Sequence, residues 1–316
     1  MTTLSHLVSP RRILADFGPH DGSLLLVTCL IHGNEPAGEK AVQEVLSHLP
    51  VDSLRCRLVV LRGNLAAVQK GVRCLDRDLN RLFPTINPPE GDLESEAVAD
   101  HAERDELKSL ILELTEEHDE KPRYFLDLHT TSSETIPYLS LPSASEDCRE
   151  FAAELPLHRV AGFAQHVAGS VDRYLHERGF LGFACEGGQH ESPESVRSMA
   201  ALLWLMLNEI GGFPDDPDGD VKLGLATSEA VLAEKIDGPP KYFTIVYRHV
   251  LRGNEEFVMK PGFSNFEVVR KGDLLAHERE GEIRAPRDGR LLMPLYQKSG
   301  NDGFFIVSEH ERIDQE

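Results

Sequence analysis

The hydrophobic positions in the first two thirds of the chain alternate between two kinds of segment. Ser23–Ile31 and Arg57–Gly63 are short, almost continuous apolar runs, which is the pattern of strands buried on both faces. Pro36–Leu49, between them, has the apolar spacing of a helix. Such alternation predicts a mainly parallel sheet covered by helices. Further along the chain, the same pattern predicts helices at Asp92–Glu117 and Ser192–Ile210. It also predicts a strand at Arg123–Leu128 and the end of another strand at Gly182–Cys185.

The pattern changes after residue 210. Gly211–Asp220 is rich in Gly, Pro and Asp, which is typical of a linker. After a short segment around Leu223–Lys235, the apolar runs are strand-like and separated by turn signals. We therefore predict an α/β domain over residues 1–213 and a small all-β domain over residues 214–316. The expected strands of the second domain are Tyr242–Val250, Phe266–Val269, Arg290–Met293 and Phe304–Val307.

Composition narrows the class of partner. The 316 residues carry a formal net charge of −20, which argues against nucleic-acid binding because no basic surface is expected. No apolar stretch is long enough to cross a bilayer, and the N-terminal residues lack the apolar region of a signal peptide. The five cysteines have no close spacing, which favours reduced thiols. We expect a cytoplasmic protein with neither a nucleic-acid nor a membrane partner.

Two histidines and a glutamate stand where expected strands end. His32 and Glu35 follow the first strand in the sequence His-Gly-Asn-Glu, and His129 follows the third. Ligands of open α/β sheets bind at the carboxyl ends of the strands, so these side chains are expected to meet. Imidazole and carboxylate groups are ordinary zinc ligands, and a catalytic zinc takes three of them. Asp127, on the same side of the strand as His129, is placed to orient the imidazole.

Two further elements carry candidate chemistry. Glu186 directly follows an expected strand and precedes two glycines, which fits a general base and acid; the alternative is an N-cap for the next helix. The segment 71–84 is rich in arginine, whose guanidinium forks suit carboxylates and developing oxyanions. Asp76, Arg77 and Asp78 within it are equally consistent with a solvated face or with internal salt bridges.

Four motifs in this order, H-G-N-E, R-x-x-D-x-D-L-N-R-x-F, D-L-H-x-T and E-G-G, resemble the succinylglutamate desuccinylase/aspartoacylase family, which is related to the zinc carboxypeptidases. The resemblance covers roughly residues 20–190. Phe263–Phe266 and Lys271–Ala276 are also similar to segments of the family's β domain. The resemblance implies a zinc carboxypeptidase-like α/β fold, with a mainly parallel mixed sheet flanked by helices and a smaller C-terminal all-β domain.

The resemblance also implies a role for each matched residue. The two histidines and the glutamate named above would hold one Zn²⁺ per subunit. Glu186 would be the general base and acid, and Arg73 would polarise the scissile carbonyl and stabilise the oxyanion. Asn80 and Arg81 would bind the carboxylate of the amino-acid half of the substrate. The implied reaction is hydrolysis of the amide bond of a small N-acyl amino acid.

The chain departs from the family pattern at two places that bear on the substrate. Aspartoacylases carry a Tyr and an Arg upstream of the catalytic Glu, and here Arg173, Tyr174 or Arg178 could supply that second carboxylate contact. Aspartoacylases also bring a Tyr from the C-terminal domain into the site, where this chain has Phe304 and Phe305. A missing hydroxyl changes which substrates a pocket accepts, so the acyl group and the amino acid stay open.

Three functions stay open at this point. A zinc-dependent N-acyl amino acid deacylase accounts for the whole set of candidate residues. A carboxypeptidase-like peptidase would also use Asn80 and Arg81, and a catalytically inactive zinc- or carboxylate-binding protein would keep the same ligands. The presence of both Glu186 and Arg73 favours an enzyme. The cellular metal is open among divalent ions, as is assembly into a homo-oligomer.

Overall fold

The computed structural model describes residues 12–84, 99–252 and 256–310. Its strands are β1 Ile13–Phe17, β2 Leu24–Cys29, β3 Arg57–Arg62, β4 Arg123–Thr131, β5 Tyr138–Ser140, β6 His158–Ala161, β7 Leu181–Gln189, β8 Tyr242–Val250, β9 Val258–Met259, β10 Val268–Val269, β11 Leu274–Glu278, β12 Gly281–Arg284, β13 Gly289–Leu292 and β14 Asp302–His310. Its helices are α1 Ala37–His48, α2 Leu65–Lys70, α3 Ala99–Glu117, α4 Glu146–Ala153, α5 Phe163–His166, α6 Val171–His176, α7 Pro193–Glu209 and α8 Gly219–Ala233, with short 3₁₀ turns at Val51–Ser53 and Leu79–Arg81.

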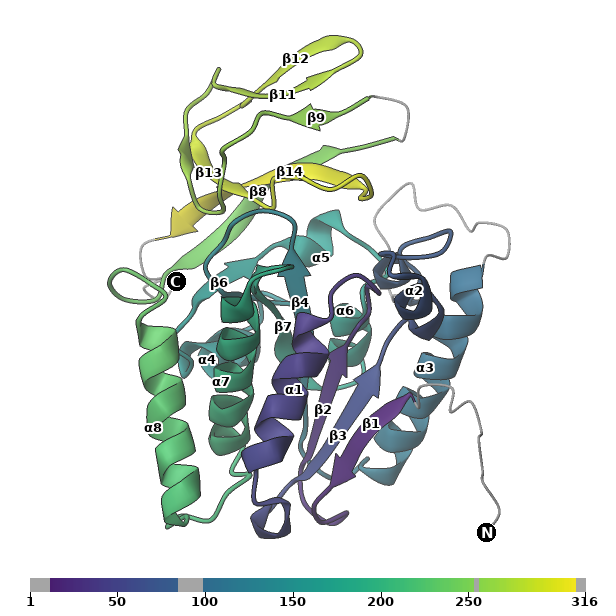
Figure 1. Ribbon diagram of the computed structural model, residues 1–316, viewed down its shortest axis with the longest axis vertical. Coiled ribbons are helices and arrows are strands. Elements are labelled where there is room, and N and C mark those ends of the chain that lie inside the picture. Colours follow the sequence, from purple (N-terminus) through teal and green to yellow (C-terminus); the bar gives the residue numbers. More distant parts are fainter. Residues whose placement is uncertain (1–11, 85–98, 253–255, 311–316) are drawn as a thin grey trace, which may run out of the picture.

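A mixed sheet forms the centre of the molecule. Within the described residues it has 11 strands in the order β1-β3-β2-β4-β7-β5-β6-β8-β14-β13-β10. Strands β3, β2, β4 and β7 are parallel neighbours, whereas β5 and β14 each run antiparallel to a neighbour. A second sheet, β12-β11-β9, lies at the C-terminal end of the molecule (Figure 1). The predicted fold class, a mainly parallel mixed sheet flanked by helices with a smaller C-terminal β part, is confirmed.

Helices cover both faces of the sheet, as the apolar runs predict. In β2 every side chain is buried, and Leu25 and Val27 pack into one core while Leu24 and Leu26 pack into another. The first core is closed by α1, α7 and α8, which lie side by side across one face in Figure 1. The second is closed by α3 and α6. A strand buried on both sides needs no polar alternation, which explains its continuous apolar sequence.

Two strands are longer than their sequence patterns predict. β4 continues through Thr131 and β7 through Gln189, so His129 and Glu186 lie within strands rather than just beyond them. The two strands stay in register there, with His129 opposite Glu186. Gly187 permits this continuation, because a Cβ at that position would lie 2.4 Å from Met199 Cγ on α7. The expected helix at Asp92–Glu117 is α3, and the part of it before Ala99 lies outside the described residues.

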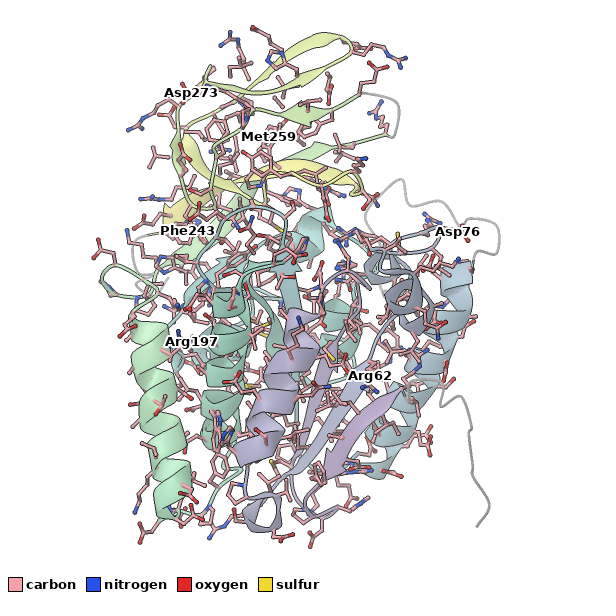
Figure 2. The ribbon with its side chains drawn as sticks, in the orientation of Figure 1. Arg62, Asp76, Arg197, Phe243, Met259 and Asp273 are labelled. Atoms are coloured by element: carbon pink, nitrogen blue, oxygen red, sulfur yellow. The ribbon has the colours of Figure 1, made fainter. Side chains whose placement is uncertain are left out.

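The C-terminal part is joined to the rest by the same sheet. β8 pairs with β6 in parallel, and Phe243 on β8 lies at the junction below Met259 and Asp273 (Figure 2). α8, on the C-terminal side of the predicted boundary, buries Leu232 in the core beneath α7. The division at residue 213 therefore stays a prediction. No helix in the described part of the chain is both long and apolar enough to cross a membrane.

Candidate active site

The loop after β2 places two of the candidate ligands. Leu30 is buried and adopts a left-handed backbone conformation with φ of 59°, which turns the chain sharply where the strand ends. Gly33 follows, and a Cβ there would lie 2.4 Å from backbone atoms of α2, so only glycine fits. This close approach brings His32 and Glu35 back over the end of the sheet.

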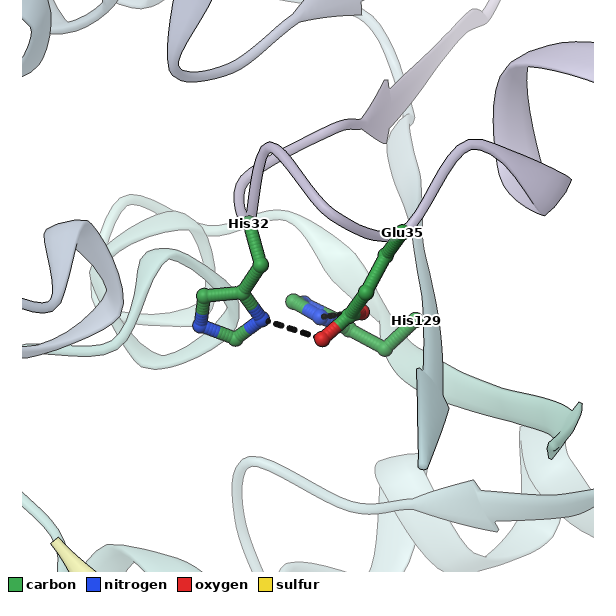
Figure 3. Close-up of side chains that lie close together, drawn as sticks. All are labelled: His32, Glu35 and His129. Carbon is green, nitrogen blue, oxygen red and sulfur yellow. Dashed lines mark hydrogen bonds and ion pairs between the residues drawn. The ribbon is translucent and has the colours of Figure 1, made fainter. Parts of the chain in front are cut away.

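His32, Glu35 and His129 form one buried cluster (Figure 3). The Nδ1 atom of His32 lies 2.8 Å from Oε1 of Glu35, and Nδ1 of His129 lies 3.2 Å from Oε2. Two atoms bound tetrahedrally to one zinc ion at about 2.0–2.1 Å lie roughly 3.3 Å apart, so these separations fit a shared ion. Burial alone would raise the pKa of Glu35, but the two imidazoles hold it well below its usual value.

The outer nitrogen of each histidine contacts a buried carboxylate. Nε2 of His129 lies 2.7 Å from Asp127, which in turn accepts a hydrogen bond of 2.6 Å from the Thr28 hydroxyl. Nε2 of His32 lies 3.0 Å from Asp78. A carboxylate on the outer nitrogen fixes the tautomer and leaves the inner nitrogen free to bind a metal. The donor set, its burial and its outer partners therefore fit a zinc site.

Glu186 faces this cluster from the neighbouring strand. It lines the pocket beside His129, and its Oε2 atom is buried with no hydrogen-bond partner among the described residues. Burial raises the pKa of Glu186 to about 8, with Glu35 adding to the effect and His129 and Arg73 opposing it. A carboxylate with an unused oxygen and a raised pKa is suited to exchanging a proton near neutral pH.

Arg73 reaches the same cluster from the loop after α2. Its guanidinium donates to Asp78 at 2.9 Å and to Glu35 at 3.3 Å. Asp78 thus contacts both Arg73 and His32. At this position, the charged segment 71–84 forms a buried ion-pair network. From the sequence, Asp78 was equally consistent with a solvated face and with an internal salt bridge. Nothing in the sequence predicted its contact with His32.

Asn80 and Arg81 follow on the 3₁₀ turn Leu79–Arg81 and line the pocket. The Asn80 side-chain oxygen accepts a hydrogen bond of 2.8 Å from the backbone N–H of Val171, which fixes the orientation of the amide. Arg81 donates to the Asn80 carbonyl at 2.9 Å and pairs with Asp302 at 3.0 Å. These contacts hold both polar groups at the wall of the pocket.

The structure does not bring Arg173, Tyr174 or Arg178 to the pocket. Arg173 donates to Glu177 and to the Ala164 carbonyl, each at 2.9 Å. The Arg178 guanidinium lies 3.4 Å above the Tyr174 ring, and Tyr174 is buried in the second core. α6 presents Asp172 to the pocket, whereas Arg173 and Tyr174 on the same helix and Arg178 just after it are outside the lining. A contact of Arg173 or Arg178 with substrate carboxylate therefore stays a prediction, to which the lining of this pocket lends no support.

The C-terminal part closes the pocket, which has a volume of about 110 Å³. Phe305 and the loop 293–301 contribute to its wall, whereas Phe304 is buried in the core of the C-terminal part. The loop is tied to the α/β part by a hydrogen bond of 3.0 Å from Tyr296 N–H to the Ser132 hydroxyl and by one of 3.2 Å from Asn34 to Gln297. The pocket is therefore shaped by both parts of the chain.

Asp100, on the first turn of α3, anchors the loop that carries Arg73 and Asp78. It is fully buried and accepts backbone hydrogen bonds from residues 75, 76 and 77 at 2.8–3.1 Å and one of 2.6 Å from Asn64. Burial opposes its ionisation, but these donors lower the pKa of Asp100 below its usual value. The sequence gives no signal for this role, because an acidic residue opening a helix is common.

Replacing Asp100 by Asn is expected to destabilise the fold by about 2–3 kcal/mol, because an NH₂ group would face the loop N–H donors. Urea unfolding followed by circular dichroism measures the change. The exposed Asp105, on the same helix, gives the matched control Asp105→Asn, for which a change within about 0.5 kcal/mol is expected. Equal stability of wild type and Asp100→Asn would contradict the anchoring role.

The comparisons with known proteins agree with this geometry. The model of the succinylglutamate desuccinylase/aspartoacylase catalytic domain matches residues 21–207. The chain belongs to this family. A succinylglutamate desuccinylase of Burkholderia thailandensis is 30% identical over 282 residues, which cover 86% of this chain and 75% of that relative. The span matched by the family model contains all three candidate metal ligands as well as Arg73 and Glu186.

Solved structures of family members share the fold. A succinylglutamate desuccinylase/aspartoacylase from Rhodobacter sphaeroides superposes with a TM-score of 0.65 at 18% identity, covering 92% of this chain and 87% of that one. An ectoine utilization protein from Ruegeria pomeroyi gives a TM-score of 0.63 at 20% identity, covering 91% and 85%. Membership of this family supports a hydrolase that acts on N-acyl amino acids.

Proposed function

We propose that the protein is a zinc-dependent deacylase that hydrolyses the amide bond of a small N-acyl amino acid. The observation that carries the proposal is the buried His32–Glu35–His129 cluster with Glu186 beside it at the wall of one pocket. His32, Glu35 and His129 would hold the metal. A divalent cation held there supplies a Lewis acid and lowers the pKa of water.

The remaining steps are assigned to side chains of this chain. The Glu186 carboxylate takes a proton from the attacking water and delivers it to the nitrogen of the leaving amino acid. The Arg73 guanidinium stabilises the negative charge that develops on the carbonyl oxygen. Asn80 and Arg81 bind the carboxylate of the amino-acid half and orient the amide for attack.

The enclosure of the pocket favours a small substrate over a peptide. Loop 293–301 and Phe305 line the same cavity as His32 and His129, and the loop is hydrogen-bonded to the α/β part through Tyr296 and Gln297. A peptide longer than a few residues would have to displace this loop. The geometry therefore supports a deacylase of small compounds rather than the carboxypeptidase-like alternative.

The proposal is tested with purified, zinc-loaded protein and a panel of N-acetyl, N-formyl and N-succinyl amino acids, with released amine as the readout. We expect hydrolysis of at least one class, loss of activity on chelation, and recovery when zinc is restored. Tripeptides and longer peptides serve as the comparison and are expected to be poor substrates. Absence of turnover on the whole panel by protein with one bound zinc would overturn the proposal in favour of a binding protein.

A further inference from the structure

The carboxylate-binding wall of the pocket contains a charge from the C-terminal part. Asp302, the first residue of β14, lines the pocket and pairs with Arg81 at 3.0 Å. Its other oxygen accepts a hydrogen bond of 2.5 Å from Arg248 on β8. Two guanidinium groups thus share one carboxylate, which leaves the Arg81–Asp302–Arg248 group with one uncompensated positive charge. That charge suits a single carboxylate of the substrate.

Apart from the proposed metal, which is assigned to the water and the scissile carbonyl, the described lining offers no further cation for a second carboxylate. Among the described residues that line the pocket, Arg73 and Arg81 are the arginines and no lysine is present. Arg73 pairs with Asp78 and Glu35 and is assigned to the carbonyl oxygen, so it is not available to a second carboxylate. The acidic side chains of the lining are Asp172, Glu186 and Asp302. An additional substrate carboxylate would therefore lose water without gaining an unused cation and would meet the carboxylate of Asp302, which is unfavourable.

Apolar side chains form part of the remaining wall, and its polar members, among them Ser170, Gln297 and Asn301, are uncharged. Phe163 and Phe305 meet edge to face with their ring centroids 5.3 Å apart, and both line the pocket. Val167, Met293 and Leu295 extend the same surface. Phe163 lies on α5 and Phe305 on β14, which crosses above the α/β part in Figure 1, so the two parts of the chain meet at this contact. Such a surface buries aliphatic or aromatic groups and gives a charged group no hydrogen-bond partner.

Resting on the proposed deacylase function, we propose that the substrate carries one carboxylate only and that both its acyl group and its amino-acid side chain are uncharged and apolar. Asp302 is the residue that determines this specificity, because it halves the positive charge of the carboxylate site and repels further anions. This substrate class differs from N-succinylglutamate, the compound in the names of several relatives, which has three carboxylates.

Four matched compounds test the proposal on the wild-type protein. N-butanoylnorvaline, N-succinylnorvaline, N-butanoylglutamate and N-succinylglutamate differ only in whether a methyl group or a carboxylate ends each arm. We expect N-butanoylnorvaline to have the highest kcat/KM and each added carboxylate to lower it by roughly 10- to 100-fold, as for like charges several ångströms apart. The difference should shrink as salt is raised, because ions screen the repulsion.

The zinc-loaded Asp302→Asn variant tests the residue itself. We expect its ratio of kcat/KM for N-succinylglutamate over N-butanoylnorvaline to rise at least 10-fold, since one negative charge is removed from the wall. A ratio is independent of how much of the variant is correctly folded. Glu280→Gln is the control, because it removes one negative charge from an exposed side chain of the C-terminal part. It should leave the ratio within about twofold of wild type.

The outcomes separate the two levels of inference. Hydrolysis of N-succinylglutamate by wild type as fast as of N-butanoylnorvaline overturns the single-carboxylate substrate while leaving the deacylase function in place. An unchanged ratio in Asp302→Asn overturns the role of Asp302. Absence of turnover on these compounds and on the wider N-acyl panel contradicts the deacylase function, and this inference with it.

Discussion

Replacing Glu186 by Gln is expected to lower kcat by about 10²–10⁴-fold while leaving zinc bound, because proton transfer by a positioned side chain contributes a factor of that order. Glutamine keeps the shape of the side chain but can neither accept a proton from water nor return it to the leaving nitrogen. The fold should be unaffected. Oε2 of the buried Glu186 side chain has no hydrogen-bond partner, and no ion pair of Glu186 is found among the described residues. Kinetics on the best substrate, together with zinc content by atomic spectroscopy, measure both parts of the expectation.

Glu191→Gln is the matched control for this experiment. Glu191 is exposed and lies five positions further along the chain, just past the end of β7, so the same chemical change there should leave kcat within about twofold. Undiminished turnover in zinc-loaded Glu186→Gln would show that Glu186 does not transfer a proton in the reaction.

The central strands and the polar residues at their carboxyl ends were predictable from the sequence. The apolar runs located β2, β3, β4 and β7, and the ends of parallel strands had to meet at one edge. His32, Glu35 and His129 were therefore predictable as a cluster, and the period of two along β4 placed Asp127 behind His129. The family resemblance then added Arg73, Asn80 and Arg81, all of which line the pocket or contact its ligands.

What the sequence could not predict depends on contacts between distant segments. Asp302 meets Arg81 across 221 positions, and Asp100 binds a loop more than twenty residues earlier. Neither residue has a local pattern that separates it from a solvated acidic side chain in a chain with 53 acidic residues. The places of Arg173 and Arg178 outside the pocket lining were equally hidden from the sequence, because they depend on how the six-residue helix α6 and the turn after it are oriented.

The position of the C-terminal part has a consequence for how the site is organised. The candidate zinc ligands and the proton-transfer residue Glu186 all come from the α/β part, near the carboxyl ends of β2, β4 and β7. The apolar wall and the carboxylate that limits Arg81 come in large part from β14 and the loop before it. In the proposed mechanism, the reacting groups thus come from the α/β part, while the C-terminal part supplies much of the wall that faces the substrate.

Replacing Glu35 by Gln is expected to abolish zinc retention and, with it, activity. Each Glu35 oxygen faces one histidine nitrogen, and Oε2 also accepts a hydrogen bond of 3.0 Å from the backbone N–H of Thr130, so the carboxylate sits at the centre of the cluster. Glutamine removes the negative charge that favours a divalent cation and presents a donor group to one imidazole. We expect wild type to keep one zinc per chain after dialysis and Glu35→Gln to keep almost none.

A graded variant separates loss of a ligand from general damage. Asp127→Asn keeps all three ligands and disturbs only the partner of His129, for which a 10- to 100-fold weaker zinc affinity is expected, with activity restored by excess zinc. Glu35→Gln should not be restored at the same zinc concentration, and the exposed Glu44→Gln on α1 should behave as wild type. If Glu35→Gln retains stoichiometric zinc and activity, the metal lies elsewhere, and the buried His–Glu–His cluster must be a charge network that merely supports the end of the sheet.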